Sequence, residues 1–213
     1  MIDLYPDAIQ RPGPDRKVYY GPNTVQGVVL HSADGYEGGL WDGIANGDLS
    51  WHFSILYDGS VWQHYPLTAR CWHSGGWGNF STIGIEHEGT KGEPLTPLQL
   101  AASVRLVRWI AQQGGWRMER AAGPDRTLFE HNEISGTACP NGRIPWDAYT
   151  EEDEMALRDA SQDEEQLFAR VLAKRAVDLL TGSNATIGAK VNEANPDQVV
   201  FTITEEMRQA ARN

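Results

Sequence analysis

Three side chains of this sequence could together hold a divalent metal ion. They are His31, His131 and Cys139, the last two within the segment HNEISGTACP. Two imidazoles and one thiolate form a ligand set suited to Zn²⁺, and they leave the fourth tetrahedral position open for water, as catalytic zinc sites do. Alternatively, both histidines are hydrogen-bonded polar residues and Cys139 is a small buried one. These residue types alone leave both interpretations open.

A short strand is predicted to position the first of these histidines. Residues 25–30 are β-branched and apolar, which indicates a buried strand ending at His31. The lead-in at residues 1–24 is rich in Pro, Gly and Asp and is predicted to be irregular. A Gly- and Asp-rich loop is expected to follow the strand at residues 34–49.

A hairpin and a further strand are predicted next along the chain. Asp58-Gly59 separates two β-rich runs in WHFSILYDGSVWQHY, which is a strong hairpin signal. Residues 82–87 have the alternation of a strand, with Ile83 and Ile85 on one face and Glu86 on the other.

The pattern changes to that of a helix at Thr96. Thr96 is a predicted N-cap, Pro97 suits the first helical position and Gln99 completes a capping box. Gly114-Gly115 is expected to end the helix. One predicted face is apolar and should lie on the sheet; it consists of Leu98, Ala102, Leu106, Trp109 and Ile110.

The order of these elements predicts an α/β or α+β domain at residues 1–149, followed by a mainly helical extension at residues 150–213. An apolar stripe between residues 151 and 180 suggests a long helix or helix pair, and Thr204 a cap of the last helix. The role of this extension is open: its stripe could dock on the first domain, or pair with another copy to form a homo-oligomer.

Composition excludes several classes of partner. The 213 residues carry a net charge of -11, which argues against nucleic acid, because binding its backbone requires clustered Lys and Arg. No apolar run approaches the roughly 20 residues of a spanning helix, so membrane insertion is not expected. No secretory signal peptide is visible at the start. The two cysteines, Cys71 and Cys139, are expected to be reduced thiols.

Five segments resemble, in order, the motifs of the type 2 N-acetylmuramoyl-L-alanine amidases. They are VVLHSA, WHFSILYDGSVWQ, CWHSGG, STIGIEHEG and HNEISGTACPNG, and the resemblance covers about residues 25–146. The family includes phage endolysins, cell-wall recycling amidases and animal peptidoglycan recognition proteins. The resemblance implies a central mixed β-sheet flanked by helices, a bound zinc ion and hydrolysis of the amide between muramic acid and L-alanine in peptidoglycan.

The resemblance also implies roles for individual residues. The family's zinc ligands fall on His31, His131 and Cys139. Its general base matches Glu86, and its oxyanion-stabilising position matches Thr137. One departure concerns Trp51, where some phage members carry a catalytic Tyr; Glu86 is then the single matching base.

Two further residues of the CWHSGG motif are predicted to bind substrate. They are His73, which is expected beside the metal, and Trp72, which could stack on a sugar ring together with Trp41 and Trp77. A structural hydrogen bond is the alternative for His73, and packing of loops onto the sheet is the alternative for the tryptophans.

Simpler alternatives apply to the other polar residues. Glu86 could be a solvent-facing strand residue, and the Thr137 hydroxyl could serve a cap or turn. His52 and His87 are predicted to be structural, and His64 to be an exposed hairpin residue. Glu88 is expected to be solvated or to lie in an outer layer around the site.

The sequence therefore predicts a zinc amidase acting on bacterial peptidoglycan, with a phage endolysin favoured over a cytosolic recycling amidase. An endolysin would stay in the host cytoplasm until it is released to the cell wall. The alternative from another class is a binding module that shares the fold and lacks the metal. Cys139 and Glu86 argue against that module, because non-catalytic members usually lack the ligand Cys.

Overall fold

The computed structural model describes residues 3–19, 21–150, 190–191 and 199–200. The chain divides into two units, Met1–Asp153 and Glu154–Asn213. In the second unit the described residues are the strands β9 (Lys190–Val191) and β10 (Val199–Val200), which pair antiparallel. The predicted helices at residues 151–180 and after Thr204, and with them the predicted pairing of copies, lie outside the described residues. No helix in the described residues has the length and apolar character to cross a membrane.

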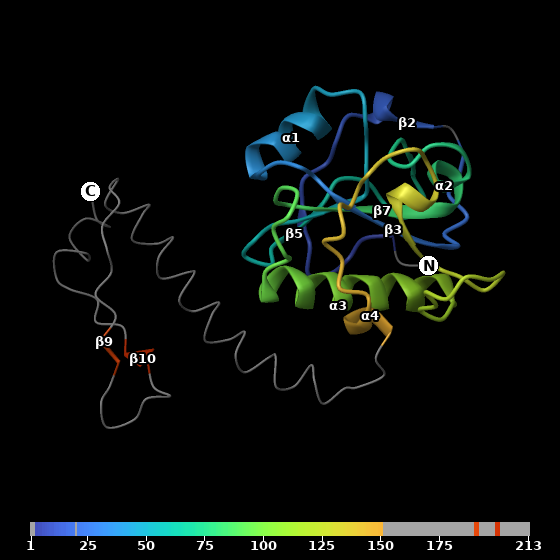
Figure 1. Cartoon of the computed structure of the whole chain (residues 1–213). Coiled ribbons are helices and arrows are strands. Elements are labelled where there is room, and N and C mark those ends of the chain that lie inside the picture. The colour runs from blue at the N-terminus through green and yellow to red at the C-terminus, as the bar shows by residue number, and fades with distance from the viewer. Residues whose placement is uncertain (1–2, 20, 151–189, 192–198, 201–213) are drawn as a thin grey trace. The chain divides into compact units, whose positions relative to one another are not determined.

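A six-stranded mixed sheet forms the centre of the first unit, in the order β1-β5-β4-β7-β3-β8. Its strands are β1 (Ile9–Gln10), β3 (Gly27–Ser32), β4 (Phe53–Ile55), β5 (Val61–Gln63), β7 (Thr82–His87) and β8 (Leu128–Glu130). Helix α3 (Pro97–Gly114) covers one face and helix α1 (Glu37–Ala45) lies on the other (Figure 1). This arrangement confirms the predicted mixed sheet flanked by helices.

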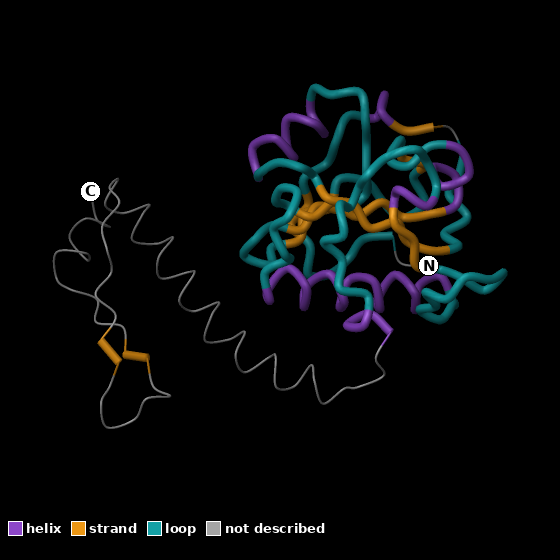
Figure 2. Tube along the Cα trace, in the orientation of Figure 1, coloured by secondary structure: helices purple, strands orange, loops and turns teal. Residues whose placement is uncertain are grey.

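Smaller elements complete the unit (Figure 2). β2 (Val18–Tyr19) and β6 (Arg70–Cys71) form a separate antiparallel pair. The short helix α2 (Gly76–Ser81) precedes β7, and α4 (Asp147–Thr150) ends the described part of the unit. Two 3-10 helices, η1 (Asp15–Lys17) and η2 (His131–Glu133), lie in the connecting segments.

Strand β3 begins two residues later than the sequence predicts and extends through His31 to Ser32. Val25 has a φ of 48°, and its N–H donates to the side-chain oxygen of Asn23. Residue 25 therefore belongs to the turn that precedes the strand. Gly27 is required in β3 because a Cβ there would collide with the Thr127 carbonyl oxygen. All six residues of β3 are buried.

Helix α3 begins and ends where the sequence predicts. The Thr96 hydroxyl accepts from the N–H of Gln99, and the Gln99 side chain accepts from the N–H of Thr96. Gly115 ends the helix in the left-handed conformation. Leu106, Val107 and Ile110 are fully buried against the sheet, so the apolar face of the helix anchors the layer below the site.

The predicted hairpin is confirmed, since β4 and β5 pair antiparallel on either side of Asp58-Gly59. The prediction of an exposed His64 is wrong: its side chain is buried and bonds to the Ser54 hydroxyl and the Arg11 carbonyl. Burial lowers the pKa of His64 to about 4, so the ring is neutral at pH 7. These hydrogen bonds could not be predicted from the sequence, because the surrounding hairpin residues are mostly apolar.

The predicted loop at residues 34–49 contains helix α1. Its glycines, Gly38, Gly39 and Gly43, lower helix propensity and hide it in the sequence. Leu40 and Ile44, four residues apart, are buried in a second apolar cluster with Trp51 and Trp62. This packing stabilises a helix that local preference alone would not predict.

Candidate metal centre

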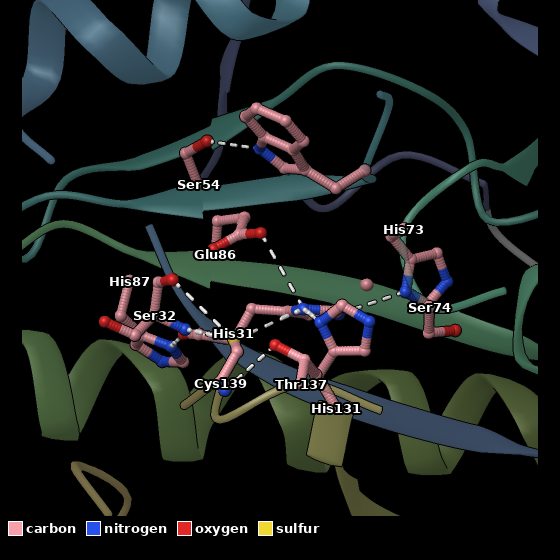
Figure 3. Close-up of polar contacts among 12 residues, drawn as sticks. His31, Ser32, Ser54, His73, Ser74, Glu86, His87, His131, Thr137 and Cys139 are labelled. Carbon is pink, nitrogen blue, oxygen red and sulfur yellow. Dashed lines mark hydrogen bonds and ion pairs between the residues drawn. The ribbon is translucent and has the colours of Figure 1, made fainter. Parts of the chain in front are cut away.

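The three predicted ligands meet at one point above the sheet. The Nδ1 atoms of His31 and His131 lie 3.2 Å apart, and Cys139 Sγ lies 3.8 Å from His31 Nδ1. One donor atom from each residue lies within 4.8 Å of the other two. Figure 3 shows the two imidazoles and the thiol converging, with Glu86 beside them.

Strand pairing explains how residues a hundred positions apart meet. β8 runs parallel to β3 with Glu130 opposite Leu30, so His131, which follows β8 in η2, arrives beside His31. The chain then turns back, and the N–H of Asn132 donates to the carbonyl of Cys139. That closed loop brings the thiol to the end of β3, where the N–H of Ser32 donates to Cys139 Sγ at 3.3 Å.

The electrostatics of these groups suit a cation. Burial lowers the pKa of His31 well below its ordinary value and also lowers that of His131, so both rings are neutral and keep a free lone pair. Burial, and then the nearby Glu86 carboxylate, raise the pKa of the Cys139 thiol to about 12. A cation at this point would offset the effects of burial and of Glu86 on the Cys139 pKa, and would stabilise the thiolate.

The spacing of the donor atoms fits zinc. Tetrahedral coordination with Zn–N of about 2.0–2.1 Å and Zn–S of about 2.3 Å separates two nitrogens by about 3.3 Å, and nitrogen from sulfur by about 3.6 Å. The observed separations are 3.2 Å and 3.8 Å. A set of two imidazoles and one thiol is also the chemistry that zinc prefers over magnesium or calcium.

Glu86 lies next to the three ligands, on the same face of the sheet. It is opposite His31 in the β3–β7 register, and its Oε1 is 3.7 Å from His31 Nδ1. The side chain is 15% exposed, which excludes the solvent-facing alternative. Burial raises the pKa of Glu86 to about 8, and a cation at the neighbouring ligands would lower it again and favour the carboxylate form that a general base requires. Its Oε2 has no hydrogen-bond partner among the residues that the structure describes, which leaves it available to a ligand or water.

His73 lies behind His31, where it bonds to the ring nitrogen that faces away from the other ligands. His73 Nδ1 is 3.1 Å from His31 Nε2, and both side chains are buried. The Asn79 side chain fixes the segment by accepting from the N–H of residues 73, 74 and 75. A Cβ on Gly84 would lie 2.5 Å from His73 Cγ, so this glycine makes room for the ring. The contact favours the structural alternative for His73.

Thr137 and Trp72 are close in the sequence to residues of the site, Cys139 and His73 respectively. The Thr137 hydroxyl accepts from the N–H of Cys139 at 3.2 Å, and the residue is exposed. This bond leaves the hydroxyl proton free to donate to another group. Trp72 is 37% exposed and packs on Tyr19, with the two ring centroids 4.9 Å apart. Tyr19 packs in turn on Phe80.

The structural predictions for two other histidines agree with their contacts. His52 bonds to the carbonyl of Ala69 and accepts from the N–H of Gly84. His87 bonds to the carbonyl of His31 and to the hydroxyl of Ser103. The two carboxylate oxygens of buried Glu88 accept from the N–H of Glu37 and Tyr57, which orders the loop before α1.

Sequence reasoning missed Arg143, four residues after Cys139. Its guanidinium donates to the carbonyls of Glu93, His87 and Glu88 and to the Ser32 hydroxyl, and the residue is 5% exposed. It therefore ties the segment after the thiol to the ends of β3 and β7. A basic residue soon after a ligand Cys was the available signal, but its partners are mostly backbone carbonyls, which have no sequence signature.

A groove of about 420 Å³ begins beside Glu86. Its walls come from three segments: residues 33–35 after β3, residues of α1, and residues 47–49 together with Trp51. The Trp51 indole N–H donates to the Ser54 hydroxyl, which bonds in turn to His64 Nε2. This buried chain holds the tryptophan ring as a fixed wall of the groove.

The comparisons with known proteins agree with this arrangement. The family model for N-acetylmuramoyl-L-alanine amidase (Amidase_2) matches residues 21–142. The N-acetylmuramoyl-L-alanine amidase LysC from Clostridium intestinale URNW is similar in fold, with a TM-score of 0.54, 21% identity and coverage of 68% of this chain and 95% of its own.

Two further solved structures have similar folds. The catalytic domain of XlyA has a TM-score of 0.53 and 24% identity, covering 67% of this chain and 95% of its own. PlyL has a TM-score of 0.56 and 17% identity, covering 72% of this chain and 96% of its own. No curated protein matches the sequence. Because the family model spans more than half of the chain, this protein belongs to the type 2 N-acetylmuramoyl-L-alanine amidase family.

Proposed function

We propose that this protein is a zinc-dependent amidase that hydrolyses the bond between the muramic acid lactyl group and the L-alanine of peptidoglycan. Family membership supports the reaction. The observation that carries the zinc proposal is the meeting of donor atoms from His31, His131 and Cys139 within 4.8 Å, next to a carboxylate oxygen that has no partner in the described part of the chain.

The proposed catalytic roles follow from the positions of the zinc ligands and Glu86. A zinc ion held by His31, His131 and Cys139 would lower the pKa of a water molecule to about 7 and polarise the amide carbonyl. Glu86 lies close enough to take the water's proton through its free Oε2 and to deliver a proton to the departing alanine nitrogen. One carboxylate thereby serves both proton transfers.

Thr137 is proposed to stabilise the negative charge that develops on the carbonyl oxygen. Its hydroxyl accepts from the N–H of Cys139, so its proton points to a different acceptor. A single donor of this kind contributes about 10²–10³ in rate when it is aligned with the oxyanion. Thr137 would therefore complement Glu86, which is proposed to transfer the protons.

We further propose that the protein acts as a phage endolysin, which reaches the wall from the host cytoplasm. Two of the solved structures with a similar fold are named endolysins, one from Clostridium intestinale and one from Bacillus subtilis. A muropeptide-recycling role is the alternative, because the motifs of this sequence resemble a family that also includes cell-wall recycling amidases. A metal-free binding module is disfavoured, since both Cys139 and Glu86 are in place.

Product analysis tests the proposed reaction. Purified full-length protein incubated with peptidoglycan should release free α-amino groups of L-alanine, with no new reducing sugar ends, and a zinc chelator should stop the release. Reducing ends without alanine amino groups would mean glycosidase chemistry and would overturn the proposal.

His73 is expected to act on the metal through His31 instead of touching substrate. In the tautomer that leaves His31 Nδ1 free for the metal, His31 Nε2 carries the proton and donates to His73 Nδ1, 3.1 Å away, so His73 would hold that tautomer. Replacing His73 with Ala should weaken zinc affinity about 10–100-fold, measured by competition with a chromophoric chelator. His73→Asn, which keeps an acceptor near the same place, should recover part of this loss. An unchanged zinc affinity with a raised KM would instead indicate substrate contact.

A further inference from the structure

The scissile amide joins a glycan to a peptide. In the bound substrate these two parts must therefore extend from the metal centre in different directions. Along β7, the His73 ring lies over Gly84, and Glu86 follows two residues later beside His31. The groove lies farther along the same direction, because Ala33, Asp34 and Gly35, which follow β3, form part of its wall. Exposed aromatic rings of Trp72, Tyr19 and Phe80 gather on the His73 side instead.

The lining of the groove suits a peptide. Four glycines, Gly35, Gly39, Gly43 and Gly47, expose backbone along it, and Leu40, Leu49 and Trp51 add apolar surface. Exposed backbone groups can bind an extended peptide, and apolar side chains can accept an alanine methyl group. Sugar rings would be better served by the aromatic faces near Trp72.

Charge gives the groove a preference among peptides. Besides Glu86, its lining contains Asp34 and Asp48, and none of its lining residues within the described part of the chain is basic. Two buried cations lie near the aspartates. Burial lowers the pKa of both Arg143 and Lys17, and the negative charge of Asp34 opposes this shift at Arg143, as that of Asp48 does at Lys17. Both are bound to backbone carbonyls, Arg143 as described above and Lys17 to Gly43 and Ile44. Neither presents its charge to the groove.

We infer that this groove receives the stem peptide and that Asp34 and Asp48 make it select peptides with an ammonium side chain over those with an additional carboxylate. The inference rests on the proposed amidase function and adds the substrate class. Stem peptides with L-lysine at the third position suit this groove. Those with meso-diaminopimelate would place an additional carboxylate near the carboxylates of Asp34 and Asp48. The repulsion is moderate because the groove is open to water.

Two muropeptides that differ only in this third residue test the inference. The zinc-loaded full-length protein should have a kcat/KM about 3–10-fold higher for the lysine form than for the diaminopimelate form, and added salt should reduce the ratio. Asp34→Asn combined with Asp48→Asn should bring the ratio close to 1. Asn suits residue 34 because its φ of 48° is a conformation that Asn adopts readily.

Matched controls separate the groove from general effects. Asp42→Asn removes the same charge from an exposed residue of α1 outside the groove, and should leave the ratio unchanged. Gly39 and Gly38 are both exposed in α1 with open space at their Cβ positions, but only Gly39 lines the groove. Gly39→Leu should therefore raise KM several-fold, and Gly38→Leu should not.

The results distinguish this inference from the proposed function. Calorimetric titration of the free lysine and diaminopimelate tetrapeptides reports the preference even where no bond is cut. Preferential binding of the lysine peptide without hydrolysis would support the groove and contradict the amidase. Hydrolysis of both muropeptides with equal kcat/KM, unchanged by the aspartate substitutions, would overturn the inference while the amidase stands.

Discussion

Replacing Glu86 with glutamine should lower kcat on peptidoglycan fragments by about 10²–10⁴-fold and leave about one zinc ion bound per chain. Glutamine keeps the size and a hydrogen-bonding oxygen of the side chain but cannot take a proton from water. Glu86 is close to the ligands, at 3.7 Å from His31 Nδ1, yet stands outside the three-residue donor set. The substitution therefore separates proton transfer from metal binding, which steady-state kinetics and zinc analysis measure independently.

Glu88 supplies the matched control for Glu86. It lies two residues farther along the chain, and its two oxygens accept from backbone N–H groups of Glu37 and Tyr57. Glu88→Gln replaces one acceptor by a donor, so it should lower the free energy of unfolding by about 1–3 kcal/mol and change kcat only slightly. If Glu86→Gln kept most of the activity, Glu86 would not be the general base.

Cys139→Ser should remove most of the bound zinc and lower activity by more than about 10³-fold, because the neutral serine hydroxyl is a poor zinc ligand and the water would lose its activation. The thiol is held at the end of β3 by the N–H of Ser32, and a hydroxyl would occupy the same place without comparable affinity for zinc. Zinc content after dialysis and the rate of release of alanine amino groups report the two effects.

The second cysteine provides the control for this substitution. Cys71 is a free, fully buried thiol on β6, and it lies outside the donor set. Cys71→Ser should cost stability but keep the zinc. Cys139→Asp should recover part of the zinc, because a carboxylate also binds this metal. Full activity of Cys139→Ser would exclude a role for the thiol in the metal site.

Local patterns in the sequence were sufficient for much of the fold. The capping residues Thr96 and Gln99 defined the start of α3, and Asp58-Gly59 defined the turn between β4 and β5. Each signal depends on a few neighbouring residues, whose conformational preferences survive in the folded protein. The motif order, in turn, predicted that His31, His131 and Cys139 would converge, which parallel pairing of β3 with β8 brings about for the two histidines.

Features that depend on tertiary packing could not be predicted in the same way. Helix α1 contains three glycines and is stabilised by burial of Leu40 and Ile44, which no local preference reveals. The burial of His64 follows from its bonds to Ser54 and the Arg11 carbonyl, far apart in the chain. The groove was missed for the same reason, since its walls include the unpredicted α1.

X-ray absorption at the zinc edge of the purified full-length protein tests the central claim most directly. We expect about one zinc per chain, with two nitrogen neighbours at about 2.0–2.1 Å, one sulfur neighbour at about 2.3 Å and one further light atom. Zinc without a sulfur neighbour, or a protein that takes up no zinc when it is supplied, would contradict the assignment of His31, His131 and Cys139 as a metal centre.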